Sequence, residues 1–65
     1  SMRIDRVKLI AEMARQSITG IELAKKAGVS RSTVTGLRGG KSCSAVTATK
    51  LASALGIPVE ELVER

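Results

Sequence analysis

The sequence contains no histidine, phenylalanine, tyrosine or tryptophan, and it has one cysteine and one proline in 65 residues. Without histidine or tyrosine, the chain lacks side chains that commonly carry general acid–base catalysis, so we expect no enzyme activity. The single cysteine permits no disulfide within the chain, and without histidine it cannot complete a common zinc site. We therefore expect no metal, no cofactor and a reduced, cytoplasmic protein.

Long apolar runs are also missing. No stretch approaches the ~18 residues that a membrane-spanning helix requires, so we expect no membrane partner. The short length predicts one domain over residues 1–65, with no room for a sensor of small-molecule ligands. Because the core has no aromatic side chains, it must consist of Leu, Ile, Val, Ala and Met, which suits packed helices.

Positive charge is concentrated in the middle of the chain. Residues 15–50 contain seven basic residues and one acidic residue, a balance of +6, whereas residues 51–65 have a balance of −2. A basic region favours a polyanionic partner such as nucleic acid. On charge alone, an ordinary solvated surface is the alternative.

The spacing of apolar residues predicts five short helices and no strands. In the first helix, over about residues 3–16, the inward stripe is predicted to be Val7, Ile10, Met13 and Ala14. Leu9 is apolar but lies off the centre of this stripe, which leaves the buried face of the first helix open.

The second and third helices have clear start signals. Thr19 is followed three residues later by Glu22, a capping box that predicts a helix over residues 20–27. Ser30 is an N-cap residue and predicts a helix over residues 31–38, which a glycine pair ends.

The last two helices are predicted from Ser44, or Ser42, to Leu55 and from Pro58 onward, with Pro58 as the first helical residue. The residues expected to face inward are Val46, Leu51, Ala52 and Leu55 in the fourth helix and Val59, Leu62 and Val63 in the fifth.

The segment TGIELAKKAGVSRSTVTGL has the features of two helices that cross at a steep angle through a tight turn. Ala24 is small enough for the crossing, Gly28 tolerates a left-handed backbone, and Val29 is an apolar plug after the turn. Val34 and Leu37 lie one helical turn apart, on the inner face of the second of these helices.

Through IELAKKAGVSRSTVTGLRGGK and TATKLASALGIPVEEL, the sequence resembles the Cro-type (XRE family) helix-turn-helix of phage repressors and related bacterial regulators. The resemblance covers nearly the whole chain and is weakest over the first fifteen residues. It implies an all-α, compact five-helix lambda-repressor-like domain, with the helix-turn-helix at about residues 20–38 and the third helix in the DNA major groove. The implied function is a sequence-specific regulator of transcription that binds double-stranded DNA, as a repressor.

The third helix is predicted to present Arg31, Ser32, Thr35 and Gly36 on the face opposite its apolar residues. Arg31 can bond guanine O6 and N7, with a phosphate contact or plain solvation as the alternatives, and Ser32 is either a base contact or a helix-start residue. Gly36 either lets the helix sit closer to the bases or marks early fraying.

Phosphate contacts are predicted at helix ends and loops. Thr33 and Arg38, on the flanks of the third helix, are candidates for packing and phosphate. The resemblance adds the start of the second helix and the loop after the third, which here are Thr19, Gly20, Ile21, Gly39, Gly40, Lys41 and Ser42.

The sequence departs from the family pattern at several positions. Gly20 stands where the family often has glutamine, and Gly36 where it has a polar or basic groove residue. Met13 and Arg38 stand where many members pair an arginine with a glutamate, which leaves Arg38 free to face DNA. Cys43 is interpreted as a small residue near a helix N-terminus, with a redox switch as the alternative.

Members that consist of this domain alone commonly bind inverted repeats as dimers, so the resemblance implies a homodimer, at least on DNA, with half-sites about one helical turn apart. The alternative function is a protein-interaction module on the same scaffold, an antitoxin or an anti-repressor. The predicted dimer contact comprises Leu55, Ile57, Val59, Leu62 and Val63.

Overall fold

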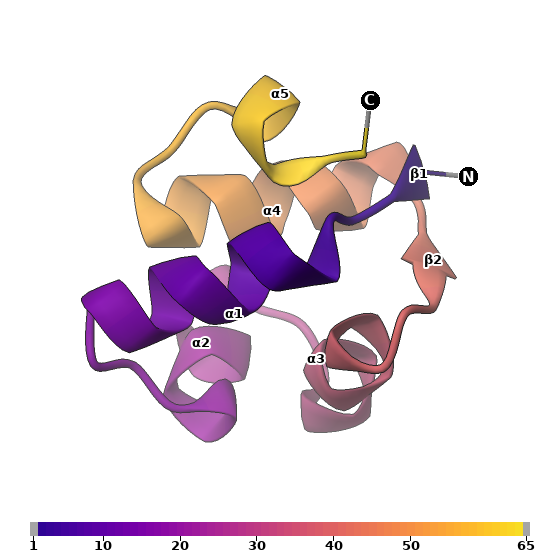
Figure 1. Cartoon of the computed structure of the whole chain (residues 1–65). Coiled ribbons are helices and arrows are strands. Elements are labelled where there is room, and N and C mark those ends of the chain that lie inside the picture. The colour runs from indigo at the N-terminus through magenta and orange to yellow at the C-terminus, as the bar shows by residue number, and fades with distance from the viewer. Residues whose placement is uncertain (1, 65) are drawn as a thin grey trace.

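The computed structural model describes residues 2–64, which form five helices and one small sheet (Figure 1). The predicted five-helix fold is confirmed, and the bounds of the second and third helices match the prediction. The helices are α1 (Arg6–Arg15), α2 (Gly20–Ala27), α3 (Arg31–Arg38), α4 (Ala45–Leu55) and α5 (Val59–Leu62).

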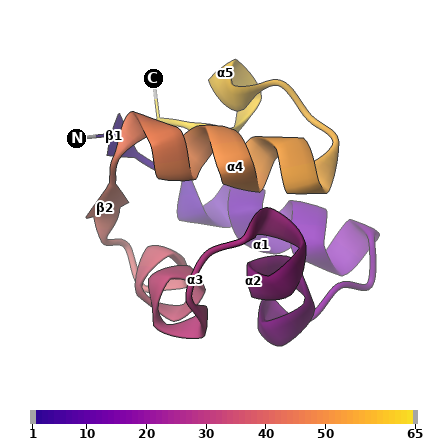
Figure 2. The same cartoon turned by 180° about the vertical axis from the view of Figure 1, so that it is seen from behind.

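Two short strands tie the start of the chain to the loop after α3. Strand β1 (Met2–Arg3) pairs antiparallel with β2 (Ser42–Cys43), and an isolated bridge joins Ile4 to Val63. Both strands lie near the start of α4 (Figure 2). The prediction of no strands was wrong, because a two-residue strand has no readable periodicity and depends on its distant partner.

Helix α1 begins at Arg6, later than the predicted residue 3, because Asp5 is its N-cap. The Oδ1 of Asp5 accepts hydrogen bonds from the amides of Val7 at 3.1 Å and Lys8 at 3.2 Å. These bonds satisfy amides that have no partner inside the helix. Met2 and Arg3 form β1 instead, and Ile4 forms the bridge to Val63.

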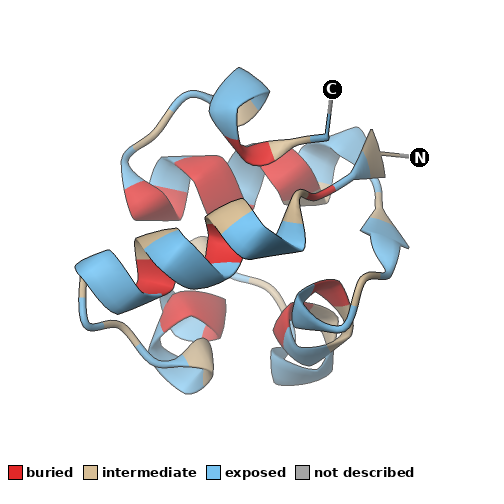
Figure 3. Cartoon of the chain, viewed as in Figure 1, coloured by how far each residue is buried: buried red, intermediate tan, exposed pale blue. Residues whose placement is uncertain are grey.

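The buried face of α1 differs from the predicted stripe (Figure 3). Leu9 and Met13 are 0% and 5% exposed, whereas Val7 and Ile10 are 71% and 43% exposed. Ala14 is exposed as well, so the prediction was wrong at three of four positions. Apolar residues occur all round α1, and packing against α3 and α5, rather than periodicity, selects the face that is buried.

Helix α4 begins after Ser44, whose Oγ accepts the amide of Thr47 at 3.2 Å. Ser42 is therefore not the cap, because it belongs to β2. Val46 is 65% exposed, so its predicted inward position was wrong. The buried residues of α4 are Ala48, Leu51, Ala52, Ala54 and Leu55.

Helix α5 starts one residue later than predicted. Pro58 is its N-cap, with an extended backbone, and the helix spans Val59–Leu62. Leu62 is fully buried, whereas Val59 and Val63 are half-buried. This short helix closes the core over α1 and α4.

Helices α1 to α4 share one kind of C-terminal end, the Schellman motif. In each helix, an amide beyond the end donates to the carbonyl five residues earlier, and the residue before that amide has a positive φ. The amide donors and carbonyl acceptors are Ile18 to Met13, Val29 to Ala24, Lys41 to Gly36, and Ile57 to Ala52. The donor residue is apolar and packs against the core in three of the four motifs, and is a lysine only in α3.

Helices α2 and α3 form the predicted helix-turn-helix and pack directly on one another (Figure 2). Gly28 has a φ of 73°, as the tight turn requires. Leu23, Ala24, Val34 and Leu37 are at most 5% exposed and fix the pair to the core. Over the described residues, no helix is both long and apolar enough to cross a bilayer.

Candidate nucleic-acid interface

Helix α3 lies on the surface with one face anchored in the core. Ser30 caps it, because its Oγ accepts the amide of Thr33 at 3.1 Å. Val34 and Leu37 are each 1% exposed. The opposite face is solvent-accessible, as the sequence predicted.

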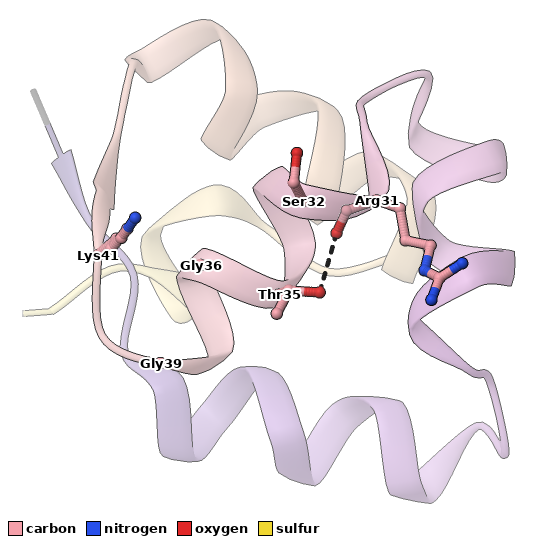
Figure 4. A pocket seen from close by; sticks show the side chains of 6 residues that line it. All are labelled: Arg31, Ser32, Thr35, Gly36, Gly39 and Lys41. Atoms are coloured by element: carbon pink, nitrogen blue, oxygen red, sulfur yellow. Dashed lines mark hydrogen bonds between the residues drawn. The ribbon is translucent and has the colours of Figure 1, made fainter.

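The predicted base-contacting residues are brought together on this face, which we call the base-facing surface. They surround an open hollow of about 660 Å³, to which Gly39 and Lys41 also contribute. In Figure 4, Arg31 and Lys41 lie at opposite ends, with the other polar side chains between them. The base-facing surface comprises Arg31, Ser32, Thr35 and Gly36.

Hydrogen bonds within α3 limit what its hydroxyl groups can offer. The Oγ1 of Thr35 donates to the backbone carbonyl of Arg31 at 3.1 Å, so its lone pairs and methyl group remain for a partner. The hydroxyl oxygens of Thr33 and Ser32 lie 2.7 and 3.2 Å from Ser30 Oγ. Thr33 is also half-buried, so of the two roles predicted for it, packing fits better than a phosphate contact.

The basic side chains around α3 form no ion pair within residues 2–64. Arg31 is the first residue of α3, where the helix dipole opposes a positive charge, and the first turn contains no acidic residue. The ion pairs formed among the described residues involve Arg3 and Arg15. Arg31, Arg38 and Lys41 therefore have no carboxylate partner in this part of the chain, which suits an anionic ligand.

The start of α2 has the predicted capping box. The amide of Glu22 donates to Thr19 Oγ1 at 3.1 Å, and the amide of Thr19 donates to Glu22 Oε1 at 2.9 Å. The bond from the Thr19 amide is the main reason that the pKa of the Glu22 carboxyl is lowered. Because that amide is occupied, only the amides of Gly20 and Ile21, which have no acceptor within residues 2–64, remain for a phosphate.

Arg38 reaches from the end of α3 back to the start of α2. A Cβ placed on Gly20 would lie 3.4 Å from Nη1 of Arg38 and 3.7 Å from Cγ1 of Val34. The guanidinium thus covers the position where the family often has a glutamine side chain. Arg38 and Met13 line one hollow between α1 and α2, as expected for positions equivalent to the family's arginine–glutamate pair.

The loop after α3 differs from the predicted phosphate-binding loop. The amides of Gly39, Gly40 and Lys41 donate to carbonyls of α3 at 3.1, 3.1 and 3.0 Å. Gly39 and Gly40 also have no side chain, so with these amides occupied the loop does not favour their predicted phosphate contacts, which stay a prediction. The side chains of Lys41 and Ser42 are exposed and remain available.

The predicted dimer contact needs a correction. Leu55 and Leu62 are 3% and 0% exposed, so both are enclosed in the core of the monomer and present no surface to a second copy. Ile57, Val59 and Val63 are half-buried at the edge of the same core. Only these three of the five residues can contribute to such a contact.

Cys43 lies half-buried in β2. Burial raises the pKa of its thiol, which favours the less reactive neutral form at neutral pH. This environment fits a small packing residue better than the redox switch. In the described part of the chain, no cluster of His, Cys, Asp or Glu side chains is arranged to hold a metal ion.

The sequence groups Lys41 with the phosphate contacts, a role that stays a prediction and does not indicate which other residues its side chain lies beside. The structure places it at the hollow of the base-facing surface. A signal was present in the sequence: a glycine just before Lys41 permits the Schellman turn, which folds the next residue back toward the residue five positions earlier, Gly36.

The family model of the Cro/C1-type HTH DNA-binding domain matches residues 8–65. The chain therefore belongs to this family of helix-turn-helix DNA-binding domains, and the resemblance seen in the sequence is confirmed. No curated protein shows significant similarity to the chain.

Among solved structures, the restriction-modification controller protein C.AhdI from Aeromonas hydrophila is similar over 86% of each chain, with 33% identity and a TM-score of 0.79. A mutant of hydroxyethylphosphonate dioxygenase matches 98% of this chain with 31% identity and a TM-score of 0.87. PhpD with cadmium matches the same share with 30% identity and a TM-score of 0.84. The chain spans only 14% of the length of either of the last two proteins, so similar folds occur in a controller protein of similar size and as a small part of much longer chains.

Proposed function

We propose that this protein is a sequence-specific regulator of transcription, of repressor type, which inserts α3 into the major groove of double-stranded DNA. The observation that carries the proposal is the base-facing surface, where exposed polar side chains surround one open hollow beside basic side chains that pair with no carboxylate in residues 2–64. Arg31 stands in the first turn of α3, the part of a recognition helix that contacts base edges. Its planar guanidinium suits the O6 and N7 atoms of guanine.

Phosphate groups would be bound on the flanks of α3. The amides of Gly20 and Ile21 lie at a helix N-terminus, which attracts anions, and the Arg38 guanidinium lies over Gly20. Ser42 is exposed on the other flank. Contacts on both flanks would set the position of α3 without selecting a sequence.

The proposal extends to assembly and location. We infer a homodimer on an inverted repeat in the cytoplasm, with half-sites about one helical turn apart, because one copy of α3 reads only a few base pairs. The half-buried apolar residues Ile57, Val59 and Val63 are its proposed contact. We infer no enzyme activity and no small-molecule ligand, since the sequence has neither histidine nor tyrosine for acid–base chemistry.

Selection of bound sequences from random duplexes tests this function. We expect enrichment of one motif with two inverted half-sites. Recovery of unenriched sequences by the folded protein would contradict sequence-specific binding. Sedimentation with the selected duplex then measures how many copies are bound. A single copy on a complete inverted repeat would contradict the proposed dimer.

A protein-interaction module on the same scaffold is the second candidate, because a similar fold also occurs as a small part of much longer chains and so does not by itself fix DNA binding. It predicts that Arg31→Ala leaves the biological activity intact. We expect instead that this substitution lowers the preference for one base by about 1–3 kcal/mol while the fold is retained. Circular dichroism and competition binding measure the two effects.

A further inference from the structure

The end of α3 places a charged residue where the other helices place an apolar one. The Schellman motifs of α1, α2 and α4 end at Ile18, Val29 and Ile57, and these side chains pack against the core. Lys41 closes the motif of α3 and is exposed. Because the motif commonly joins its last residue to the residue five positions earlier, Lys41 is directed onto Gly36.

Gly36 provides the space for this contact. A Cβ placed on Gly36 would lie 3.1 Å from Cδ of Lys41 and 3.8 Å from both its Cβ and its Cγ. The aliphatic stem of Lys41 therefore crosses the helix surface where a side chain at position 36 would stand. Lysine stems commonly cover such a surface while the ammonium group stays in solvent.

The fraying account of Gly36 does not fit this arrangement. Helix α3 continues through Gly36 to Arg38, and the carbonyl of Gly36 accepts the amides of Gly39 at 3.1 Å and Lys41 at 3.0 Å. The end of the helix is thus firmly hydrogen-bonded. The glycine is explained by the side chain packed over it.

Lys41 consequently reaches the base-facing surface from outside α3. It lines the same hollow as Arg31, Ser32 and Thr35, and Figure 4 shows it at the end opposite Arg31. No carboxylate pairs with Lys41 in the described part of the chain. Its ammonium group is a donor suited to guanine O6 and N7 in the major groove.

We propose that Lys41 is a specificity-determining residue that reads a base through the space left by Gly36, supplying the polar group that position 36 lacks. This inference rests on the proposed function, because it needs α3 to lie in the major groove. A contact of Lys41 with phosphate alone is the competing outcome.

The test measures competition among duplexes that differ from the selected operator at one position each. Lys41→Met keeps most of the stem and removes the charge, and Lys50→Met on the exposed surface of α4 is the matched control. We expect Lys41→Met to lower the preference at one base position by about tenfold, and Lys50→Met to leave all preferences unchanged. An equal loss of affinity for every duplex would overturn the proposal.

A double-mutant cycle tests the role of Gly36. We expect Gly36→Ala to reduce the preference at the same position, because the added methyl displaces the Lys41 stem, and to have no further effect there when Lys41 is already methionine. An effect of Gly36→Ala that is equal in both backgrounds would mean that the methyl itself meets the DNA, and would contradict the proposal.

Failure of the proposed function has a different signature. In that case the wild-type protein enriches no motif, whereas failure of the Lys41 inference leaves the motif intact and the position-specific effect absent. Circular dichroism melting of each variant excludes unfolding as the cause of lost binding.

Discussion

Gly20 and Gly36 are both helical glycines covered by a basic side chain, but their surroundings differ. Arg38 covers Gly20 at the first position of α2, beside amides that have no acceptor within residues 2–64. Lys41 covers Gly36 within α3, on the base-facing surface. The first pair suits phosphate and the second suits base edges. A missing side chain on a helix can therefore admit a charged group from elsewhere in the chain.

Replacing Arg38, the cation that covers Gly20, is expected to have the largest effect on DNA binding. Arg38→Met should weaken binding to all duplexes by roughly tenfold and lower the slope of log affinity against log salt by about one, because one phosphate contact is lost. Titrations of specific and unrelated duplexes at several salt concentrations measure this. Lys26→Met on the exposed surface of α2 is the control, and a loss confined to one base position would reverse the assignment.

The turn that positions Lys41 can be tested without changing Lys41 or Gly36. Gly40 has a φ of 100° and Gly28 a φ of 73°, and in both cases the space around an added Cβ is open. Gly40→Ala and Gly28→Ala should each lower the free energy of unfolding by about 1–2 kcal/mol, through backbone strain alone. Urea unfolding measures the loss.

Binding distinguishes these two glycine variants. At a temperature where both are folded, we expect Gly40→Ala to change the preference at the base assigned to Lys41. Gly28→Ala should leave that preference unchanged. The same base preference in both variants would argue against positioning by the Gly40 turn.

The packing of Lys41 on Gly36 also predicts a smaller effect on stability. Alanine is favoured over glycine within a helix by up to about 1 kcal/mol. In Gly36→Ala part of this gain should be lost, because the added Cβ would lie 3.1 Å from Cδ of Lys41 and the lysine stem must move away from it. Thermal melts should show a larger gain from Gly36→Ala in a Lys41→Ala background, and equal gains in both backgrounds would argue against the contact.

The smallest expected effect concerns Glu22, an acidic group beside Gly20 that has no equivalent at the start of α3. Its pKa is lowered in the folded protein, mainly by the Thr19 amide. Its contribution to stability is therefore present above the ordinary glutamate pKa of about 4.3 and is lost as the pH falls through the lowered value. Glu22→Gln should reduce the dependence of stability on pH in this acid range, as followed by urea unfolding between pH 3 and 7.

Local signals explain what could be predicted from the sequence. The bounds of α2 and α3 were predictable because Thr19, Glu22 and Ser30 act on amides within three residues. The assignment of Arg31 and Thr35 to an exposed face followed from helical periodicity alone.

Tertiary contacts explain what could not be predicted. The buried face of α1 is selected by α3 and α5, because Val7 and Ile10 are as apolar as the buried Leu9. The strands depend on a pairing across forty residues of chain. The position of the Lys41 side chain depends on the φ of Gly40 and on the direction of the lysine stem. Both are defined only in the folded chain.

Methylation interference on the selected duplex tests the central claim most directly, because dimethyl sulfate modifies guanine N7 in the major groove and adenine N3 in the minor groove. If α3 enters the major groove, N7 methylation of guanines within each half-site blocks binding, and N3 methylation of adenines there does not. Interference only at adenine N3, or at no base, would contradict the account.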